Sequence, residues 1–317
     1  MSFFEFLQQI YHKNLQGYTA LNGGIDKFLY NGSKITQEIK GKLSFPTNSY
    51  AFVLQKGEDK VFFSKEVLGY YNNDYDITNF STETYLHNSA IPRAEYIKNY
   101  LEQVRKYHFH DTGKNSPFHQ ISNIRTDASF LYSDGSNIAA LLYKIKQDKE
   151  GETSKVYQRI VRIIESIAPY FLDFVLEPNE NGYIELLWRN KFSEQLYNTY
   201  NLSDGTLRFI ALAVLLSQPK LPKTIIIDEP ELGLHPFAIA KLAGLLKSAS
   251  QQGCQIIVAT QSVELINHFT PEDIITVDYH EGESTFKRLE KEALSVWLED
   301  FSLGELWKGN FINGQPF

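Results

Sequence analysis

The sequence predicts an α/β protein whose last third forms a parallel sheet with helices packed on it, because helix and strand patterns alternate there. Residues 224–227 are a continuous β-branched run, which is typical of a strand buried on both faces. An apolar stripe beginning at Leu207 indicates a helix before this strand, and residues 236–250 carry a similar stripe after it. Strands at 255–259 and 274–277 continue the alternation, so we expect them in the same sheet.

The composition indicates a globular protein of a reducing cytoplasm. The 317 residues, of which 43% are hydrophobic, can bury one main core with an inserted subdomain. Cys254 is the only cysteine, so neither an intramolecular disulfide nor a thiolate-rich zinc site can form. No apolar run reaches the roughly 18 residues that span a bilayer, and we expect no membrane partner. The net charge of -7 provides no overall attraction to nucleic acid but leaves room for a local basic groove.

The N-terminal region, residues 1–69, is expected to combine a helix with an antiparallel β-subdomain. Apolar residues recur at helical spacing from Phe3 to Tyr11, so the chain opens on a helix. Residues 43–54 and 60–63 are typical of two strands joined by a hairpin loop.

The middle region, residues 70–170, is predicted to be a mostly helical insertion. Residues 70–88 are rich in Asn, Asp, Thr and Tyr and lack a helical period, which indicates a polar surface excursion. The elements expected after it are three helices and one short strand: helices at 92–106, 138–146 and 160–167, and a strand at 107–111.

The third region, residues 171–317, opens on a predicted hairpin with strands at 171–176 and 183–188 and later reaches a pair of carboxylates. Asp228 and Glu229 follow the buried strand at its carboxyl end, the edge at which ligands bind in open α/β sheets. A carboxylate there can hold Mg²⁺ directly or through water, and the next can orient and deprotonate an attacking water. The alternative is a strand that simply ends in two acidic residues.

Three motifs in fixed order carry a resemblance to a known family. They are Leu202-Ser203-Asp204-Gly205-Thr206, Asp228-Glu229-Pro230-Glu231-Leu232-Gly233-Leu234-His235-Pro236 and Ala259-Thr260-Gln261-Ser262. The set resembles the ABC-type ATPase heads of the RecF and SMC kind, and more closely the stand-alone bacterial "AAA family" predicted ATPases grouped as AAA_21. The resemblance implies a P-loop NTPase fold: an ABC-type ATPase head with a parallel core sheet, an antiparallel β-subdomain and a helical insertion.

The resemblance also implies a role for residues in each motif. It implies that Asp228 binds Mg²⁺, that Glu229 is catalytic and that Gln261 is a catalytic switch residue, at a position where many ABC ATPases carry histidine. Further residues, in the signature motif and the D-loop (231–235), are implied to bind ATP: Ser203, Asp204, Gly205, Thr206, Gly233 and His235.

Elementary chemistry agrees with these roles but leaves simpler alternatives open. Ser203 and Gly205 stand at the start of a helix, where free N–H groups and the positive end of the dipole favour a phosphate. Taken alone, such a Ser-Asp-Gly start is more often an ordinary N-cap. Gln261 can hydrogen-bond a γ-phosphate or the attacking water but cannot take up a proton as imidazole does, and the alternative is a polar loop residue.

The sequence contains no G-x-x-x-x-G-K-[ST] loop, whose backbone N–H groups cradle phosphates while its lysine offsets their charge. Residues 32–34 and 41–43 keep only fragments of this motif. In the resembled family the loop leads directly into a helix near the N-terminus, and the helix from Ser2 has the apolar pattern of that element. The expectation is therefore an N-terminal truncation, with the phosphate loop encoded upstream of Met1.

Two functions follow from the resemblance. The first is an ATP-binding and ATP-hydrolysing head that forms a homodimer around ATP and couples turnover to DNA transactions or to an effector protein, in DNA repair, a mobile element or anti-phage defence. The second is a catalytically incompetent regulatory or partner subunit that donates its signature motif in trans. The two differ in whether a phosphate loop completes this chain's own site.

Overall fold

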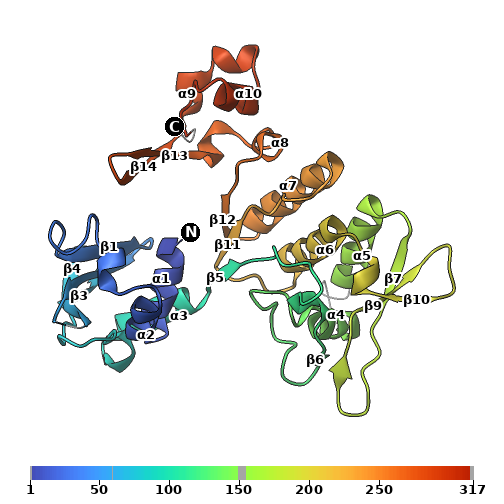
Figure 1. Ribbon diagram of the computed structural model, residues 1–317, viewed down its shortest axis with the longest axis horizontal. Coiled ribbons are helices and arrows are strands. Elements are labelled where there is room, and N and C mark those ends of the chain that lie inside the picture. Colours follow the sequence, from blue (N-terminus) through green and yellow to red (C-terminus); the bar gives the residue numbers. More distant parts are fainter. Residues whose placement is uncertain (1, 59, 149–154, 315–317) are drawn as a thin grey trace. The chain divides into compact units, whose positions relative to one another are not determined.

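The computed structural model describes residues 2–58, 60–148 and 155–314, and its contacts divide the chain into two compact units (Figure 1). The first unit comprises Met1–Val104 with Glu281–Glu283, and the second comprises Arg105–His280 with Ser284–Phe317. The boundaries predicted from the sequence, near residues 70 and 171, differ from this division. The division into residues 1–69, 70–170 and 171–317 therefore stays a prediction.

The first unit is an antiparallel sheet covered by short helices. Its four strands follow one another in the sheet in chain order: β1 Glu38–Ser44, β2 Asn48–Lys56, β3 Val61–Tyr70 and β4 Asn73–Asp76. Its helices are α1 Ser2–Tyr11, α2 Leu15–Leu21 and α3 Pro92–Glu102, with 3-10 turns at Ile25–Lys27 and Leu86–Asn88. The helix expected from the first residues and the β2–β3 hairpin are confirmed.

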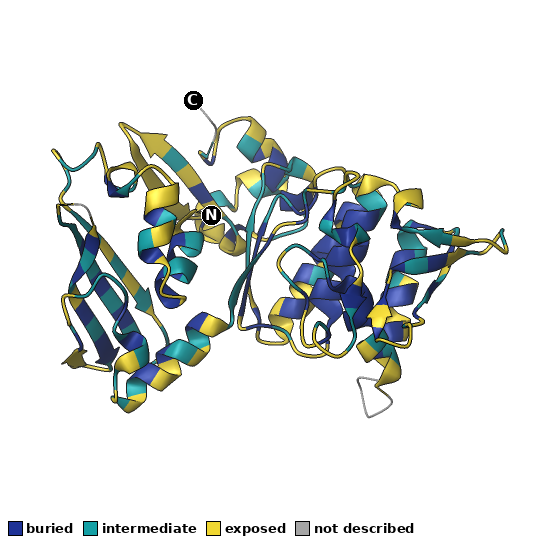
Figure 2. Cartoon of the chain, turned by 60° about the horizontal axis from the view of Figure 1, so that its bottom comes forward, coloured by how far each residue is buried: buried dark blue, intermediate teal, exposed yellow. Residues whose placement is uncertain are grey.

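Alternation along the strands builds the core of this unit. Every second residue of β2 from Asn48 to Leu54 is buried, so the dark and light bands along the sheet in Figure 2 follow the two-residue period of a strand. Phe52 and Phe63 pack against the apolar faces of the helices. The side-chain amide of Gln8 in α1 donates to the carbonyls of Leu101, at 3.1 Å, and Val104, at 2.8 Å, which ties α1 to the end of α3.

A fully buried carboxylate, Glu66 on β3, stands in this core. Its oxygens accept from the Tyr50 hydroxyl at 2.7 Å, from Thr84 Oγ1 and from the Tyr85 backbone N–H at 2.9 Å. Burial and the neighbouring Glu66 charge raise the pKa of Tyr50 well above its ordinary value, so the hydroxyl keeps its proton and remains a donor. The group is therefore a satisfied structural network, as a buried charge requires.

Several boundaries predicted in this part of the chain are wrong. The strand expected over 43–54 is interrupted by a turn at 45–47, because Pro46 has no N–H to give to a ladder. The polar stretch 70–88, expected as a polar surface excursion without a helical period, contains the short strand β4, which is exposed along its whole length and so shows no apolar alternation in the sequence. The helix expected over 92–106 ends at Glu102, and the strand expected at 107–111 is instead β5, Val104–Tyr107.

The second unit holds the predicted parallel sheet. Its three strands lie in the order β12 (Gln255–Ala259), β11 (Thr224–Asp228) and β5. Strands β11 and β12 are parallel, with Thr224 opposite Gln255 and Asp228 opposite Ala259. The α/β class and the parallel core are therefore confirmed.

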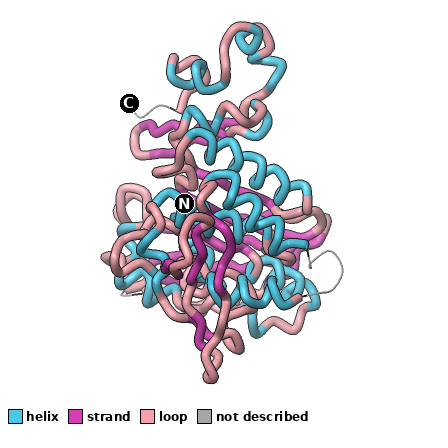
Figure 3. The backbone as a smooth tube through the Cα atoms, turned by 90° about the vertical axis from the view of Figure 1, so that its right-hand side faces the viewer, coloured by secondary structure: helices cyan, strands magenta, loops and turns pink. Residues whose placement is uncertain are grey.

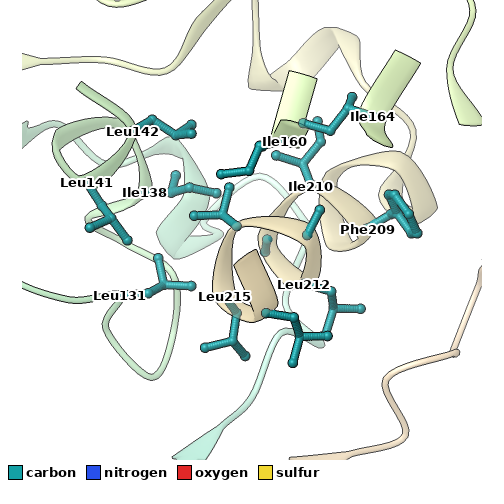
Figure 4. Packing of buried hydrophobic residues seen from close by; sticks show 14 of the residues in the cluster. Leu131, Ile138, Leu141, Leu142, Ile160, Ile164, Phe209, Ile210, Leu212 and Leu215 are labelled. Atoms are coloured by element: carbon teal, nitrogen blue, oxygen red, sulfur yellow. The ribbon is translucent and has the colours of Figure 1, made fainter. Parts of the chain in front are cut away.

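Four helices share one hydrophobic core with this sheet: α4 Ile138–Gln147, α5 Val156–Ile167, α6 Asp204–Ser217 and α7 Pro236–Gln251. Figure 3 colours the backbone by secondary structure, with helices in cyan and strands in magenta. Every residue of α6 from Leu207 to Ser217 is buried, and Ile210 lies among Ile138, Ile160 and Ile164 of α4 and α5 (Figure 4). A helix that is apolar on all sides is expected at the centre of a core, and α6 occupies that place.

Two other predicted strand arrangements are wrong. The strand expected at 274–277 is β13 (Ile275–His280), which pairs with β14 (Glu283–Arg288) and not with the parallel sheet, since most of its side chains are exposed. The strand expected at 183–188 is two strands: β8 (Tyr183–Ile184) pairs with β6 (Ser122–Asn123), and β9 (Leu187–Asn190) pairs with β7 (Phe171–Val175). Strand β10 (Leu196–Asn198) extends the β7–β9 sheet.

The end of the described chain has a small core of its own. Its helices are α8 Val263–Ile266, α9 Lys291–Leu294 and α10 Leu303–Lys308, with 3-10 turns at Pro271–Asp273 and Trp297–Glu299. Ile266, Leu289, Leu303, Leu306 and Ile312 form its apolar cluster. Within residues 2–58, 60–148 and 155–314, no helix combines the length and the apolar character needed to cross a bilayer.

Candidate functional site

The carboxyl ends of β11 and β12 bring two of the predicted motifs together. Asp228 is the last residue of β11 and lies opposite Ala259, the last residue of β12. The ladder continues one step further, because the Glu229 backbone N–H donates to the Ala259 carbonyl at 2.8 Å. The acidic pair and the segment that contains Gln261 therefore leave the sheet at the same edge.

Glu229 has an unusual backbone conformation. Its φ is 40°, in the left-handed region that non-glycine residues rarely adopt. The turn is held by hydrogen bonds from Leu232 N to the Glu229 carbonyl, at 3.2 Å, and from Leu234 N to the Glu231 carbonyl, at 2.9 Å. Strain of this kind, of the order of 1–3 kcal/mol, collects where function demands a particular side-chain direction.

Arg208 connects the edge to the buried helix. It is 6% exposed although it is charged, and its guanidinium donates to three backbone carbonyls. Nε reaches Phe109 at 2.9 Å, Nη2 reaches His110 at 3.2 Å, and Nη1 bonds to Leu232. Burial lowers the pKa of Arg208, but an arginine remains charged at neutral pH, so these bonds are charge-assisted.

His110 extends this connection to the acidic pair. Its Nε2 lies 3.0 Å from the backbone carbonyl oxygen of Asp228, which places the ring directly beside the end of β11. The sequence had indicated only that residues 107–111 alternate aromatic and polar side chains. The sequence does not predict the contacts of Arg208 and His110. The one sequence feature that could have pointed to Arg208 is its position as a charged residue within the apolar pattern of α6.

Gly205 and Gly233 make the closest approach between the signature motif and the D-loop. A Cβ on Gly205 would overlap the carbonyl oxygen of Gly233, and Gly233 itself has a φ of 75°. The two motifs, 28 residues apart in the chain, are therefore in backbone contact. Glycine is required at 205 for space and at 233 for conformation.

The remaining predicted nucleotide ligands lie at the starts of two helices. Ser203 is the N-cap of α6, and its Oγ accepts from Thr206 N at 3.2 Å and lies 2.8 Å from Thr206 Oγ1. Asp204 is exposed in the first turn of α6. His235 is the N-cap of α7, where Nδ1 accepts from Phe237 N at 3.2 Å. The ordinary capping role is thus present at both helices, and nucleotide binding stays a prediction for these residues.

A further carboxylate, Glu231, joins the two loops that follow β11 and β12. Its side chain accepts a hydrogen bond from Thr260 Oγ1, which in turn accepts from Ser262 N at 2.9 Å. Glu231 is 9% exposed, and its second oxygen, Oε2, is buried with no hydrogen-bond partner. Desolvation by burial raises the pKa of Glu231, and the Thr260 hydrogen bond opposes that shift. Gln261, between Thr260 and Ser262, is exposed.

The residues at this edge could supply only some of the ligands of a magnesium ion. Within the described ranges no group of three or more His, Cys, Asp or Glu side chains is arranged to hold a metal ion. Mg²⁺ is commonly bound by one or two carboxylates together with substrate phosphates and waters, so Asp228 could supply the protein's part of such a site. The donor set therefore fits a magnesium ion that arrives with a phosphate ligand.

Comparison with known proteins assigns the chain to a family. The model of the family described as "AAA domain, putative AbiEii toxin, Type IV TA system" matches residues 41–267, which is well over half of the chain. The chain belongs to this family. The matched region contains all three motifs, from Leu202 to Ser262.

Individual relatives agree with an ABC-type ATPase head. The "Putative ABC transporter ATP-binding protein" of Pyrococcus horikoshii is 31% identical over 108 residues, which cover 34% of this chain and 40% of that protein. An energy-coupling factor transporter ATP-binding protein of Streptococcus pyogenes is 31% identical over 114 residues, covering 34% of this chain and 39% of its own length. The match thus spans less than half of the curated relatives' length.

The fold is also similar to that of an ATPase head of known structure. The crystal structure of an SMC head bound to the C-winged helix domain of ScpA aligns with a TM-score of 0.51 over 93% of this chain and 88% of that one, at 16% identity. At such low identity the likeness concerns the fold alone. The predicted ABC and SMC-like head architecture is confirmed.

The contact at Gly205 predicts that two Gly→Ala substitutions change stability in opposite directions. Gly205→Ala should destabilise the protein by about 1–3 kcal/mol, because the new methyl group has to displace the Gly233 backbone. Gly244→Ala in α7, where a Cβ meets nothing within 4 Å, should stabilise it by about 0.5–1 kcal/mol through helix propensity. Urea unfolding of both variants measures the difference. Stabilisation by both substitutions would show that the contact at Gly205 is not tight.

The second prediction concerns Arg208. Arg208→Met should lower the free energy of unfolding by about 3 kcal/mol or more, because three backbone carbonyls lose a charged donor. The matched control is Arg189→Met on an exposed position of β9, which should change stability by less than about 0.5 kcal/mol. Equal effects in chemical denaturation would contradict the role assigned to Arg208.

The third prediction is a pH dependence. Because the pKa of Glu231 is raised on folding, the folded protein binds more protons than the unfolded chain, and stability falls as pH rises above the ordinary value of 4.5. Glu231→Gln has no carboxylate to ionise, so the variant should lose part of this decline. Unfolding curves recorded from about pH 4 to 8 test it, with the exposed Glu264→Gln as control. An unchanged pH slope in Glu231→Gln would show that the buried carboxylate does not titrate as inferred.

Proposed function

We propose that the chain is the ATP-hydrolysing part of an ABC-type head, with the site at the carboxyl ends of β11 and β12. The observation that carries this proposal is the pairing of Asp228 with Ala259, which sets the acidic pair beside the loop of Gln261. Membership in an AAA-domain family supports it. The backbone contact between Gly205 and Gly233 supports it further, since it joins the signature motif to the loop that follows the acidic pair.

The proposed chemistry is hydrolysis of the terminal phosphoanhydride of ATP. Water attacks the γ-phosphorus, the bond to the bridging oxygen breaks, and ADP leaves with the negative charge. Glu229 accepts the proton of the attacking water, and Gln261 orients that water through its side-chain amide. A magnesium ion, when bound with ATP beside Asp228, would offset the charge of the phosphates.

Two features of the protein suit Glu229 to this task. Glu229 has a left-handed backbone conformation, whereas Asp228 is paired with Ala259 in the ladder. Glu231, the third acid of the segment, is buried and bonded to Thr260, so it contributes to the shape of the loops and not to proton transfer. The three carboxylates therefore have different environments and are assigned different roles.

Dimerisation and partners form the finer part of the proposal. Ser203 and Asp204 at the start of α6 are exposed, so they are accessible to a nucleotide held by a second copy of the chain. We therefore include a homodimer around ATP, with turnover coupled to DNA transactions or to an effector protein, as in repair or anti-phage defence. A cytoplasmic location fits the sole, buried cysteine, Cys254.

A second candidate function rests on the missing phosphate loop. The 317 residues contain no G-x-x-x-x-G-K-[ST] motif, while the signature motif is present and its Ser203 and Asp204 are exposed. A subunit of this composition could donate its signature motif to a partner that holds ATP.

Titration with a fluorescent ATP analogue separates the two functions. Binding that weakens in Asp228→Asn supports the first. Absence of binding, together with stimulation of a partner's turnover that is lost in Ser203→Arg, supports the second.

The proposed base gives the fourth prediction. In a preparation that hydrolyses ATP, Glu229→Gln should reduce turnover by about 10²–10⁴-fold, the usual contribution of a general base. ATP binding should be retained, since Asp228 is unchanged. Phosphate release and equilibrium binding are measured in parallel, with Glu264→Gln in α8 as a control that removes an exposed carboxylate. Turnover of Glu229→Gln equal to that of the control would remove Glu229 from its role.

A further inference from the structure

Two hydrogen bonds connect the loop that follows β11 with the loop that follows β12. The Glu229 backbone N–H donates to the Ala259 carbonyl at 2.8 Å, and the Thr260 hydroxyl donates to Oε1 of Glu231. A single hydrogen bond would let the two loops turn about it, whereas two bonds at separate points fix one loop against the other. The loop that carries the proposed base is therefore held to the loop that carries Gln261.

Thr260 also closes a turn around Gln261. Its Oγ1 accepts from the Ser262 backbone N–H at 2.9 Å, a bond that reaches two residues along the chain and has the form of a Ser/Thr turn. Ser262 is itself the N-cap of α8, where its Oγ accepts from Leu265 N at 3.1 Å. Gln261 thus has an anchored residue on each side, and its exposed side chain leaves the turn from a fixed backbone.

One hydroxyl group performs both tasks. The Thr260 hydroxyl has a single proton, which it donates to Glu231, and its oxygen accepts from the Ser262 N–H. Glu231 is buried, so water competes little for its bond, and among the described residues its Oε2 has no hydrogen-bond partner. A carboxylate in such a place costs stability, and an apolar side chain could fill the same space. What the carboxylate provides here is an acceptor for Thr260.

Position matters more for an amide than for an imidazole next to the attacking water. The Gln261 side chain can hydrogen-bond this water but cannot take up its proton. Its contribution then lies in where it holds the water, and a displacement of about 1 Å can lower a rate about 100-fold. We propose that Thr260 and Glu231 are positioning residues that act through Gln261 and set its place relative to Glu229. Their role rests on the proposed function, since it requires Gln261 to act in ATP hydrolysis.

The test compares substitutions in the full chain. Thr260→Val keeps the shape of the side chain and removes the hydroxyl, whereas Thr260→Ser keeps the hydroxyl. Glu231→Met removes the acceptor and leaves the turn to Ser262 intact, so it is the second test variant should Thr260→Val fail to fold. The matched control is Thr224→Val at the opposite end of β11, where Oγ1 donates to Gln255 Oε1 at 3.2 Å and links the same two strands.

Two measurements are made on each variant. The first, hydrogen exchange of the Ser262 amide, needs no nucleotide. Exchange should be about 2–12-fold faster in Thr260→Val than in the control, because the amide loses its acceptor. The second is the pair of constants kcat and KM for ATP. Thr260→Val and Glu231→Met should lower kcat about 10–100-fold with little change in KM, and Thr260→Ser should restore most of the loss.

The outcomes separate positioning from other roles. A wild-type kcat in Thr260→Val, or an equal loss in Thr260→Ser and Thr224→Val, would overturn the proposal. A loss confined to KM would also overturn it, because it would assign the hydroxyl to substrate binding. Unchanged Ser262 exchange in Thr260→Val would show that the hydroxyl does not hold the turn. Absence of ATP turnover in the wild-type chain, with the exchange difference intact, would refute the proposed hydrolysis and with it the catalytic role of the turn.

Discussion

The buried guanidinium of Arg208 is the interaction on which the arrangement of the candidate site depends. It donates to carbonyls of the segment after β5 and of the loop after β11, two stretches of backbone that leave the sheet at or near its edge. His110, whose carbonyl accepts one of these bonds, is itself in contact with the end of β11. A single charged side chain thereby relates the signature helix, the acidic pair and the D-loop. A neutral residue of the same volume could fill the space but could not donate to three carbonyls in these two stretches of backbone.

The three carboxylates after Ile227 show how environment separates residues of the same type. Asp228 is the last residue of β11, Glu229 follows in a left-handed conformation, and Glu231 is buried and accepts a hydrogen bond from Thr260. The strained backbone at Glu229 and the unpaired Oε2 of Glu231 both cost stability. Neither would be needed if these residues served packing alone. Natural structures keep such costs where a side chain has a task, so their concentration within four residues is the structural argument for a functional edge.

Sequence reasoning predicted the elements whose patterns are strongest. The β-branched run of β11 and the apolar positions of α6 signal burial on all sides, and both elements lie where they were expected. It failed where pairing partners decide the outcome. Nothing in residues 183–188 shows that they split between two sheets, and β13 has too short a pattern to show that it leaves the parallel sheet. At the site, the motif order identified the acidic pair, but the contacts of Arg208, His110 and Thr260 depend on distant backbone atoms that no local pattern encodes.

The burial of α6 on every side also has a mechanical meaning. A helix enclosed by α4, α5, α7 and the sheet cannot roll or bend independently, because each of its faces is filled by another element. It can move only as a rod, together with its neighbours. With its N-cap it reaches from Ser203, in the signature motif, to Ser217, which accepts the hydrogen bond of Arg159, a distance of about 20 Å. Any displacement imposed at one end is therefore delivered to the other end with little loss.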